Sequence, residues 1–302
     1  MAQGTFASGV DRRQVVLATA AAALAGSPFG IGAQSGEPDR LDLVYARFSG
    51  GDDPRIHFPL ALLKLAMQKV GRSYTVRPSA PVMERGRAIR ELAKGGSEVN
   101  VIWTSMGADV ERQLRPIRIP LYRGLIGHRI FIIHRQRQPD FASVNSLDDL
   151  KRFTAGQGIG WVDQKIMQSA GLKVIVDTYD SMFKMVDRGL VDYFPRGANE
   201  AVAEVRARAA SFPDLVVESH LMLVYKSDNI FYTSLANEEL ARLIEQGLLA
   251  AYADGSFMKL YHEHPYVQKV LDEARLERRL RLEIANPMLS DEDLAVPARF
   301  WL

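Results

Sequence analysis

Residues 172–194 read LKVIVDTYDSMFKMVDRGLVDYF, in which short apolar runs flank a segment of helical periodicity. The run at 174–176 predicts a short buried strand. Asp180 or Ser181 is a typical residue to begin the helix that follows, and a second strand is expected at 190–194. Three apolar side chains recur on one side of that helix: Met182, Met185 and Val186. A strand, a helix and a strand in succession favour an α/β fold.

The same alternation continues on both sides of this segment. Before it, strands are predicted at 41–45, 74–76, 99–103 and 159–162, with helices near 60–70, 84–94, 146–153 and up to 170. After it come a helix at 199–210, strands at 215–217 and 221–225, and helices near 240–248, 257–261 and 273–281. The tail at 286–302 carries apolar Phe300 and Trp301, which we expect to pack on the surface of the protein. These elements predict two α/β lobes with mostly parallel sheets covered by helices.

Composition excludes several classes of protein. The chain has 302 residues, 47% of them hydrophobic, and its 38 basic and 36 acidic residues leave a net charge of only +2. Dedicated nucleic-acid binders carry a strongly basic face, so a nucleic-acid partner is not expected. There is no cysteine, which excludes a thiol nucleophile, a disulfide, an iron–sulfur cluster and a lipid-modified cysteine anchor.

The N-terminus resembles an export signal. Arg12 and Arg13 precede an uncharged apolar stretch at 15–25, and small residues follow to about residue 33. This layout is typical of a secretory signal, and the apolar stretch is too short to span a bilayer stably. We therefore predict a signal peptide at 1–33, of the twin-arginine or the general type, and a soluble periplasmic protein that is not membrane-embedded once the signal is removed. The alternative is an N-terminal buried helix.

Several stretches later in the chain resemble one known family in their order and spacing. They are RAIRELAKG at 87–95 with VNVI at 99–102, TSMGADVER at 104–112 with IPLY at 119–122, SLDDLK at 146–151, GLVDY at 189–193, and the segment 237–261. They are similar to the bacterial family 3 of periplasmic solute-binding proteins, the polar amino-acid type, over most of residues 39–265.

The resemblance implies a periplasmic binding protein type II fold. Two hinge-linked lobes would enclose a small-molecule ligand in the cleft between them. Lobe 1 would comprise residues 39–132 plus 222–302 and lobe 2 residues 133–221, with the chain crossing between lobes near 131–135 and 221–225. The family also implies binding without catalysis, no cofactor, and a partner in the permease of an ABC-type membrane transporter.

The resemblance also implies a set of ligand-binding residues. Arg112 falls on the family arginine that holds a ligand carboxylate, a role that suits the two-pronged guanidinium; its alternative is a surface arginine. Thr104 and Ser105 lie on the strand-end loop that supplies hydrogen bonds, although ordinary loop chemistry explains them equally well. Tyr45 and Trp103 end two strands, where an aromatic ring is able to stack on a ligand or belong to the core.

The second lobe supplies the other candidates. Asp163 and Lys165 lie on the turn where the family presents backbone N–H groups to an anion, while an exposed lysine is the alternative for Lys165. The family's acidic residue for the ligand ammonium is replaced by Gly197, beside Arg196. A cation there favours an anionic ligand with one or two acid groups over a neutral amino acid. Glu200 is close enough in sequence to offset that preference.

Other functions remain as alternatives. A sensory partner of a membrane receptor, or a dehydratase or lyase on the same fold, is compatible with this layout, and His57, Asp163 and Glu200 are the acid–base candidates for an enzyme. The glycines at 156–160 lack the spacing of a dinucleotide loop. His262 and His264 offer two imidazoles but no third metal ligand.

Overall fold

The computed structural model of the protein describes residues 40–48, 54–95 and 98–302, and these ranges belong to one compact unit. The predicted signal peptide at 1–33 lies outside the described residues. Within the described ranges, no helix is both long and apolar enough to cross a membrane.

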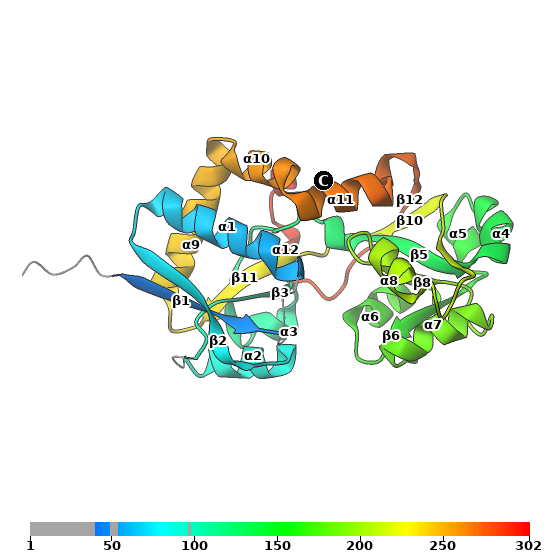
Figure 1. Ribbon diagram of the computed structural model, residues 1–302, viewed down its shortest axis with the longest axis horizontal. Helices are drawn as coiled ribbons and strands as arrows, with labels where there is room; N and C mark the ends of the chain where they lie inside the picture. Colours follow the sequence, from blue (N-terminus) through cyan, green and yellow to red (C-terminus); the bar gives the residue numbers. More distant parts are fainter. Residues whose placement is uncertain (1–39, 49–53, 96–97) are drawn as a thin grey trace, which may run out of the picture. The chain divides into compact units, whose positions relative to one another are not determined.

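Strands and helices alternate along much of the chain, which confirms the α/β class (Figure 1). The strands are β1 (Leu41–Arg47), β2 (Tyr74–Val82), β3 (Ile102–Ser105), β4 (Leu114–Ile117), β5 (His128–His134), β6 (Thr154–Gly158), β7 (Lys173–Asp177), β8 (Phe194–Gly197), β9 (Leu215–Val217), β10 (Leu221–Val224), β11 (Asn229–Ser234) and β12 (Leu280–Glu283). The helices are α1 (Pro54–Val70), α2 (Arg85–Ala93), α3 (Ala108–Glu111), α4 (Gln138–Ala142), α5 (Leu147–Leu150), α6 (Val162–Ser169), α7 (Tyr179–Asp187), α8 (Ala201–Arg208), α9 (Glu238–Ala253), α10 (Ser256–Glu263), α11 (Pro265–Ala274) and α12 (Asp291–Leu294). Short 3-10 helices lie at Leu125–Gly127, Arg135–Arg137, Leu276–Arg278 and Ala298–Phe300.

The sheets are mixed rather than mostly parallel. β1–β2 and β6–β7 are parallel pairs, whereas β11 runs antiparallel to both β3 and β4. The largest sheet has the order β12-β10-β5-β8, with β9 also on β5, and only its β10–β12 pair is parallel. The expectation of mostly parallel sheets is wrong because β5 and β11 each pair antiparallel with two or more neighbours.

Strand β5 separates two hydrophobic clusters. Successive side chains of a strand point to opposite faces. Accordingly Ile130 and Ile132 belong to one cluster, with α7 and the β1–β2 region, and Phe131 and Ile133 belong to the other, with α4 and α6. The two segments in which the sequence placed its crossings, β5 and β10, are hydrogen-bonded neighbours through Leu223 and Arg129.

Three predicted elements are displaced or replaced. The strand expected at 159–162 is β6, which ends at Gly158, and the strand expected at 190–194 is β8, which begins at Phe194. The cause at β6 is close packing: a Cβ on Gly156 would lie 2.6 Å from the Met182 sulfur, so this buried strand carries no apolar run. Thr178, rather than Asp180 or Ser181, caps α7. The charged segment at 273–281 is not one helix, because its end forms the edge strand β12.

The C-terminal tail packs onto the fold as expected. Phe300 is 3% exposed and its ring lies 4.8 Å from that of Tyr252. The backbone carbonyl of Trp301 accepts a hydrogen bond of 2.6 Å from the Arg123 guanidinium.

Candidate functional site

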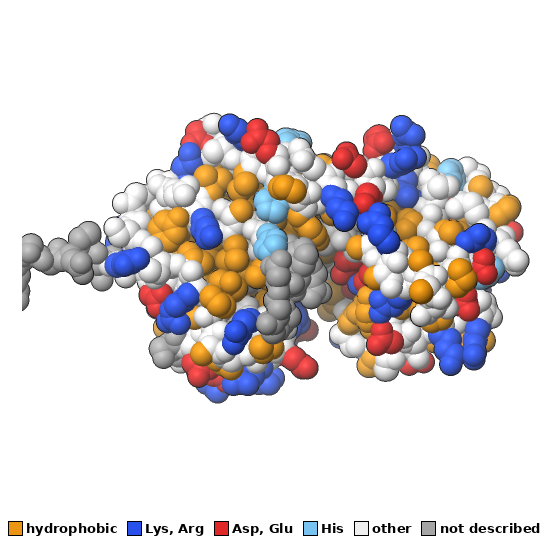
Figure 2. All heavy atoms as spheres, in the orientation of Figure 1, with side chains coloured by type: hydrophobic (Ala, Val, Ile, Leu, Met, Phe, Trp, Pro, Cys, Tyr) orange, Lys and Arg blue, Asp and Glu red, His pale blue; other side chains and the backbone are white. Residues whose placement is uncertain are grey.

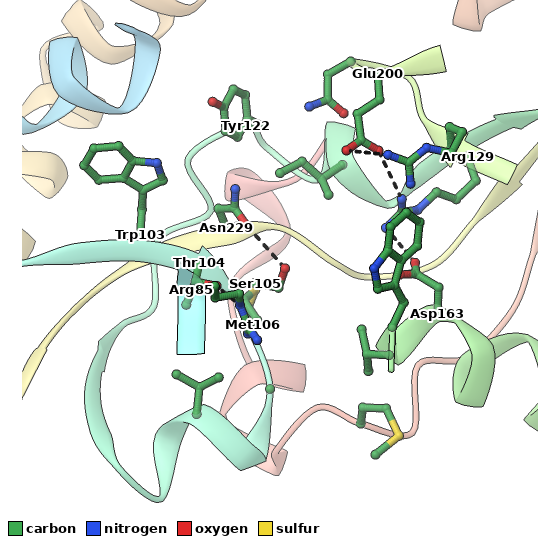
Figure 3. Close-up of a pocket in the computed structure, with 18 of the residues that line it drawn as sticks. Arg85, Trp103, Thr104, Ser105, Met106, Tyr122, Arg129, Asp163, Glu200 and Asn229 are labelled. Carbon is green, nitrogen blue, oxygen red and sulfur yellow. Dashed lines mark hydrogen bonds and ion pairs between the residues drawn. The ribbon is translucent and has the colours of Figure 1, made fainter. Parts of the chain in front are cut away.

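A cavity of about 600 Å³ lies between two walls that come from different sheets (Figure 3). The first wall is built from the end of β3, the start of β11 and the start of α2. The second is built from β5, β8 and the turn into α6. Polar, charged and aromatic side chains line both walls. They include Arg85, Trp103, Thr104, Ser105 and Asn229 on the first wall, and Arg129, Trp161, Asp163, Arg196 and Glu200 on the second. A cavity of this size, with polar groups converging from two sides, is typical of a small-molecule site.

The polar groups of the first wall follow from strand ends. β3 and β11 pair antiparallel with Ser105 opposite Asn229, so the last residues of one strand meet the first of the other. The Ser105 hydroxyl lies 3.5 Å from the Asn229 side-chain oxygen. Thr104 is 6% exposed and its hydroxyl accepts a 2.5 Å hydrogen bond from Nε of Arg85.

Arg85 is the cation of the first wall. It is the first residue of α2, and part of it is exposed to solvent. Within the described parts of the chain it makes a hydrogen bond to Thr104 but no ion pair with a carboxylate. Partial burial lowers the pKa of its guanidinium, although the group stays charged at neutral pH. Arg85 therefore brings to the cavity a positive charge that has no ion-pair partner among the described residues.

The second wall also holds two arginines, but their charges are compensated. Arg129 is 6% exposed and ion-pairs with Asp163 at 2.7 Å, and its guanidinium lies 5.4 Å from the centre of the Tyr225 ring. The Tyr225 hydroxyl donates to the same Asp163 carboxylate. A more distant carboxylate, that of Glu200, lies 3.8 Å from Arg129. Removing one partner of such a buried pair would leave an uncompensated charge. We therefore regard Arg129, Asp163 and Tyr225 as a structural part of the wall.

Arg196 is compensated even more completely. It donates two hydrogen bonds of 2.8 Å to the Glu204 carboxylate and pairs with Glu200 at 3.0 Å. Its guanidinium is stacked 4.6 Å from the centre of the Trp161 ring. Burial opposes the charge, but the carboxylates of Glu200 and Glu204 hold the pKa of Arg196 above its usual value. The sequence-based interpretation of Arg196 as an excess cation beside the ligand therefore loses its support.

The structure brings five of the eight predicted site residues to the cavity: Trp103, Thr104, Ser105, Asp163 and Arg196. The other three do not line it. Tyr45 is 8% exposed and packs in the core with its ring 5.6 Å from that of Trp103. Arg112 follows the last turn of α3 and ion-pairs with Asp109, both side chains being about two-thirds exposed or more. Lys165 is exposed on α6.

Sequence reasoning missed Arg85, Arg129 and Trp161. Arg129 left a signal, since it is a lone charge inside the apolar strand β5, and buried arginines are rare unless paired. Arg85 lies in a charged helix, where nothing in the sequence distinguishes it from its neighbours. Trp161 fell within a segment interpreted as strand, whereas it is the residue before α6.

Two of the acid–base candidates for an enzyme are ion-paired, and the third lies outside the cavity. Asp163 and Glu200 are both held in ion pairs with arginines, and His57 is exposed and does not line the cavity. In the part of the chain that the structure describes, no three His, Asp or Glu residues form a group that would hold a metal ion. His264 caps α11, its ring nitrogen accepting from the Tyr266 amide at 3.3 Å.

Comparison with known proteins gives structural similarity only. No protein-family model matches the chain, and no curated protein matches it. Among solved structures it is similar to an ancestral arginine-binding protein bound to arginine, with 19% identity, a TM-score of 0.48, and coverage of 74% of this chain and 97% of that one. It is also similar to a histidine kinase sensor domain with similarity to periplasmic binding proteins (14% identity, TM-score 0.49, coverage 74% and 94%). A third is an amino acid ABC transporter substrate-binding protein from Streptococcus pneumoniae bound to L-arginine (13%, 0.46, 78% and 95%). At these identities and TM-scores the similarity does not identify a ligand or a partner of this chain.

Proposed function

We propose that this protein is a solute-binding protein that takes a small molecule with at least one acid group into the cavity between the two walls. The observation that carries the proposal is Arg85, a guanidinium at the cavity with a hydroxyl partner but no carboxylate among the described residues. Thr104, Ser105 and Asn229 surround it with hydrogen-bonding groups on the same wall. A guanidinium receives a carboxylate or phosphate through two parallel hydrogen bonds, which suits it to this role.

Charge balance supports an anion at this wall rather than at the opposite one. Asp163 compensates Arg129, and Glu200 with Glu204 compensates Arg196, so the second wall offers no excess positive charge. A ligand acid group near Arg85 gains an uncompensated partner, whereas one near Arg196 would compete with two carboxylates already in place. The proposed ligand therefore has one acid group bound at Arg85, and the second wall calls for no further acid group.

The family resemblance adds to this proposal a two-lobed architecture, a cellular compartment and a partner. The two walls would belong to a lobe of residues 39–132 with 222–302 and a lobe of residues 133–221, closing on the ligand about the crossing strands β5 and β10. The protein would act in the periplasm and deliver its ligand to a membrane transporter. The visible face carries interspersed acidic and basic side chains rather than a field of one sign (Figure 2), which suits such a carrier better than a nucleic-acid binder.

The test is thermal unfolding in the presence of a panel of amino acids, dicarboxylates, keto acids and phosphorylated metabolites. A ligand at about 100 times its dissociation constant stabilises the folded state by about 2.7 kcal/mol, a shift of several degrees. Arg85→Ala is the test variant, and Arg87→Ala is the matched control, because Arg87 is an exposed arginine of the same helix that does not line the cavity. Arg112→Ala tests the sequence-based prediction, and it also removes the ion-pair partner of Asp109, which lines the cavity.

We expect an acid to raise the unfolding temperature of the wild type and of Arg87→Ala but not of Arg85→Ala. A shift that survives in Arg85→Ala would refute the assignment of the anion site. A shift lost only in Arg112→Ala would restore the sequence-based prediction of that arginine. If no compound shifts the wild type, the proposal of a small-solute site is wrong.

A further inference from the structure

Strand β7 (Lys173–Asp177) is an edge strand. Within the described ranges it pairs only with β6, in parallel, and forms a two-stranded sheet with it. An edge strand presents backbone N–H and C=O groups that are able to pair with another strand, and proteins normally cover or blunt such edges.

The backbone groups that face outward are those of Val174 and Val176. The amide of Ile159 donates a 3.0 Å hydrogen bond to the carbonyl of Asp177, which shows that the carbonyl of Asp177 faces the β6 side. Because these groups alternate along a strand, Lys173 and Ile175 also direct theirs to β6, while Val174 and Val176 direct theirs to the free edge.

The same edge is apolar at its centre. Ile175 is 42% exposed and Val176 is 38% exposed, and Ile159, which extends β6 beside Asp177, is 64% exposed. Val174 and Val176 lie on the face opposite Ile175, and Val174 is partly buried there against the neighbouring hydrophobic cluster. The strand is therefore anchored through Val174 and leaves Ile175, Val176 and its outer edge available.

The sequence of β7, KVIVD, is complementary to itself when read in the opposite direction. If two copies pair antiparallel about Ile175, Lys173 of each copy lies opposite Asp177 of the other, so the interface contains this ion pair at both ends. Val174 then faces Val176, and these are the residues with outward backbone groups, so each such pair exchanges two hydrogen bonds. Within the described parts of the chain neither Lys173 nor Asp177 has an ion-pair partner of its own.

We propose that β7 pairs with β7 of a second copy of this chain, antiparallel and centred on Ile175, to form a two-fold symmetric dimer. Such an interface uses the same patch on both subunits, and a self-complementary strand satisfies that requirement. The charge pattern favours a second copy over an unrelated peptide, because both ion pairs are supplied by β7 itself.

The test is sedimentation of the full chain over a roughly hundred-fold concentration range, in wild type and four variants. Lys173→Asp and Asp177→Lys each place two pairs of like charges across the interface, and each is expected to weaken the dimer by about tenfold or more. The double variant K173D/D177K restores the opposite charges in reverse order and should recover the dimer. Val176→Pro removes an outward N–H that the monomer does not use, so it should abolish the dimer with little change in unfolding temperature.

Each outcome decides the proposal. A wild type that is monomeric throughout the range overturns it, and so does a dimer that persists in Val176→Pro. Failure of K173D/D177K to recover what the single variants lose would overturn the register centred on Ile175, provided that thermal unfolding shows the double variant folded.

Discussion

Replacing Asp228 with Ala should destabilise the fold and loosen the first wall of the cavity. Asp228 is fully buried between β10 and β11, and its carboxylate accepts hydrogen bonds from three backbone amides. These belong to Tyr122 (3.1 Å), Gly124 and Asn229 (2.6 Å). Tyr122 and Asn229 both line the cavity, so this single side chain holds one loop and one strand start in place.

The magnitude follows from what the substitution leaves behind. A buried donor without a partner costs about 1–3 kcal/mol, and Asp228→Ala creates three of them. Burial raises the pKa of Asp228 to about 7, which means that removing the carboxylate also relieves its desolvation. We therefore expect a net loss of about 2–4 kcal/mol, a large share of the roughly 5–15 kcal/mol of a typical protein. Asp228→Asn keeps one accepting oxygen and should lose less.

The assay is urea unfolding at pH 8, with Asp228→Asn and Asp214→Ala as the two controls. Asp214→Ala removes an exposed carboxylate that pairs with Arg135 at 3.0 Å, and such surface pairs contribute about 1 kcal/mol or less. A loss below about 1 kcal/mol in Asp228→Ala, equal to that of Asp214→Ala, would refute the argument that the three amides depend on this side chain.

Two further predictions concern stability. His128 is buried, with Nδ1 2.9 Å from the carbonyl of Gly124, and burial lowers the pKa of this imidazole. The stability that neutral His128 contributes is therefore fully present above the pKa of the unfolded chain, near 6.5, and is lost as pH falls, by at most about 1.4 kcal/mol per pH unit. In urea unfolding between pH 7 and 5, His128→Gln should therefore lose less stability than the wild type. Gly247 lies where α9 meets α1, and a Cβ there would come within 2.1 Å of the Ala66 carbonyl oxygen. Gly247→Ala should destabilise by about 1–3 kcal/mol or more despite better helix propensity, while Gly86→Ala in the open part of α2 should stabilise slightly; equal thermal unfolding of the two variants would contradict this.

Local features of this fold were predictable from the sequence because they depend on residues close together in the chain. Ser146 begins α5 by accepting from the Asp149 amide at 3.1 Å, a contact between residues only three apart in the chain. Gly71 and Gly189, which follow the ends of α1 and α7, adopt φ of 67° and 66°, a region that other residues avoid. Phe300 packs as an apolar tail residue should.

Which arginine faces the cavity was decided only by the tertiary structure. Arg112 and Arg85 are both arginines in charged, helical surroundings, and nothing local distinguishes them. The difference arises because α2 starts beside the end of β3, where Thr104 accepts from Arg85, while α3 leaves Arg112 beside Asp109 at the surface. Likewise, Arg196 carries a positive charge in any sequence-based argument, and only the folded chain places Glu204 against it. Charge, capping and periodicity are properties of short segments and can be read from the sequence, whereas the availability of a charge to a ligand depends on which distant residues the fold brings within about 4 Å of it.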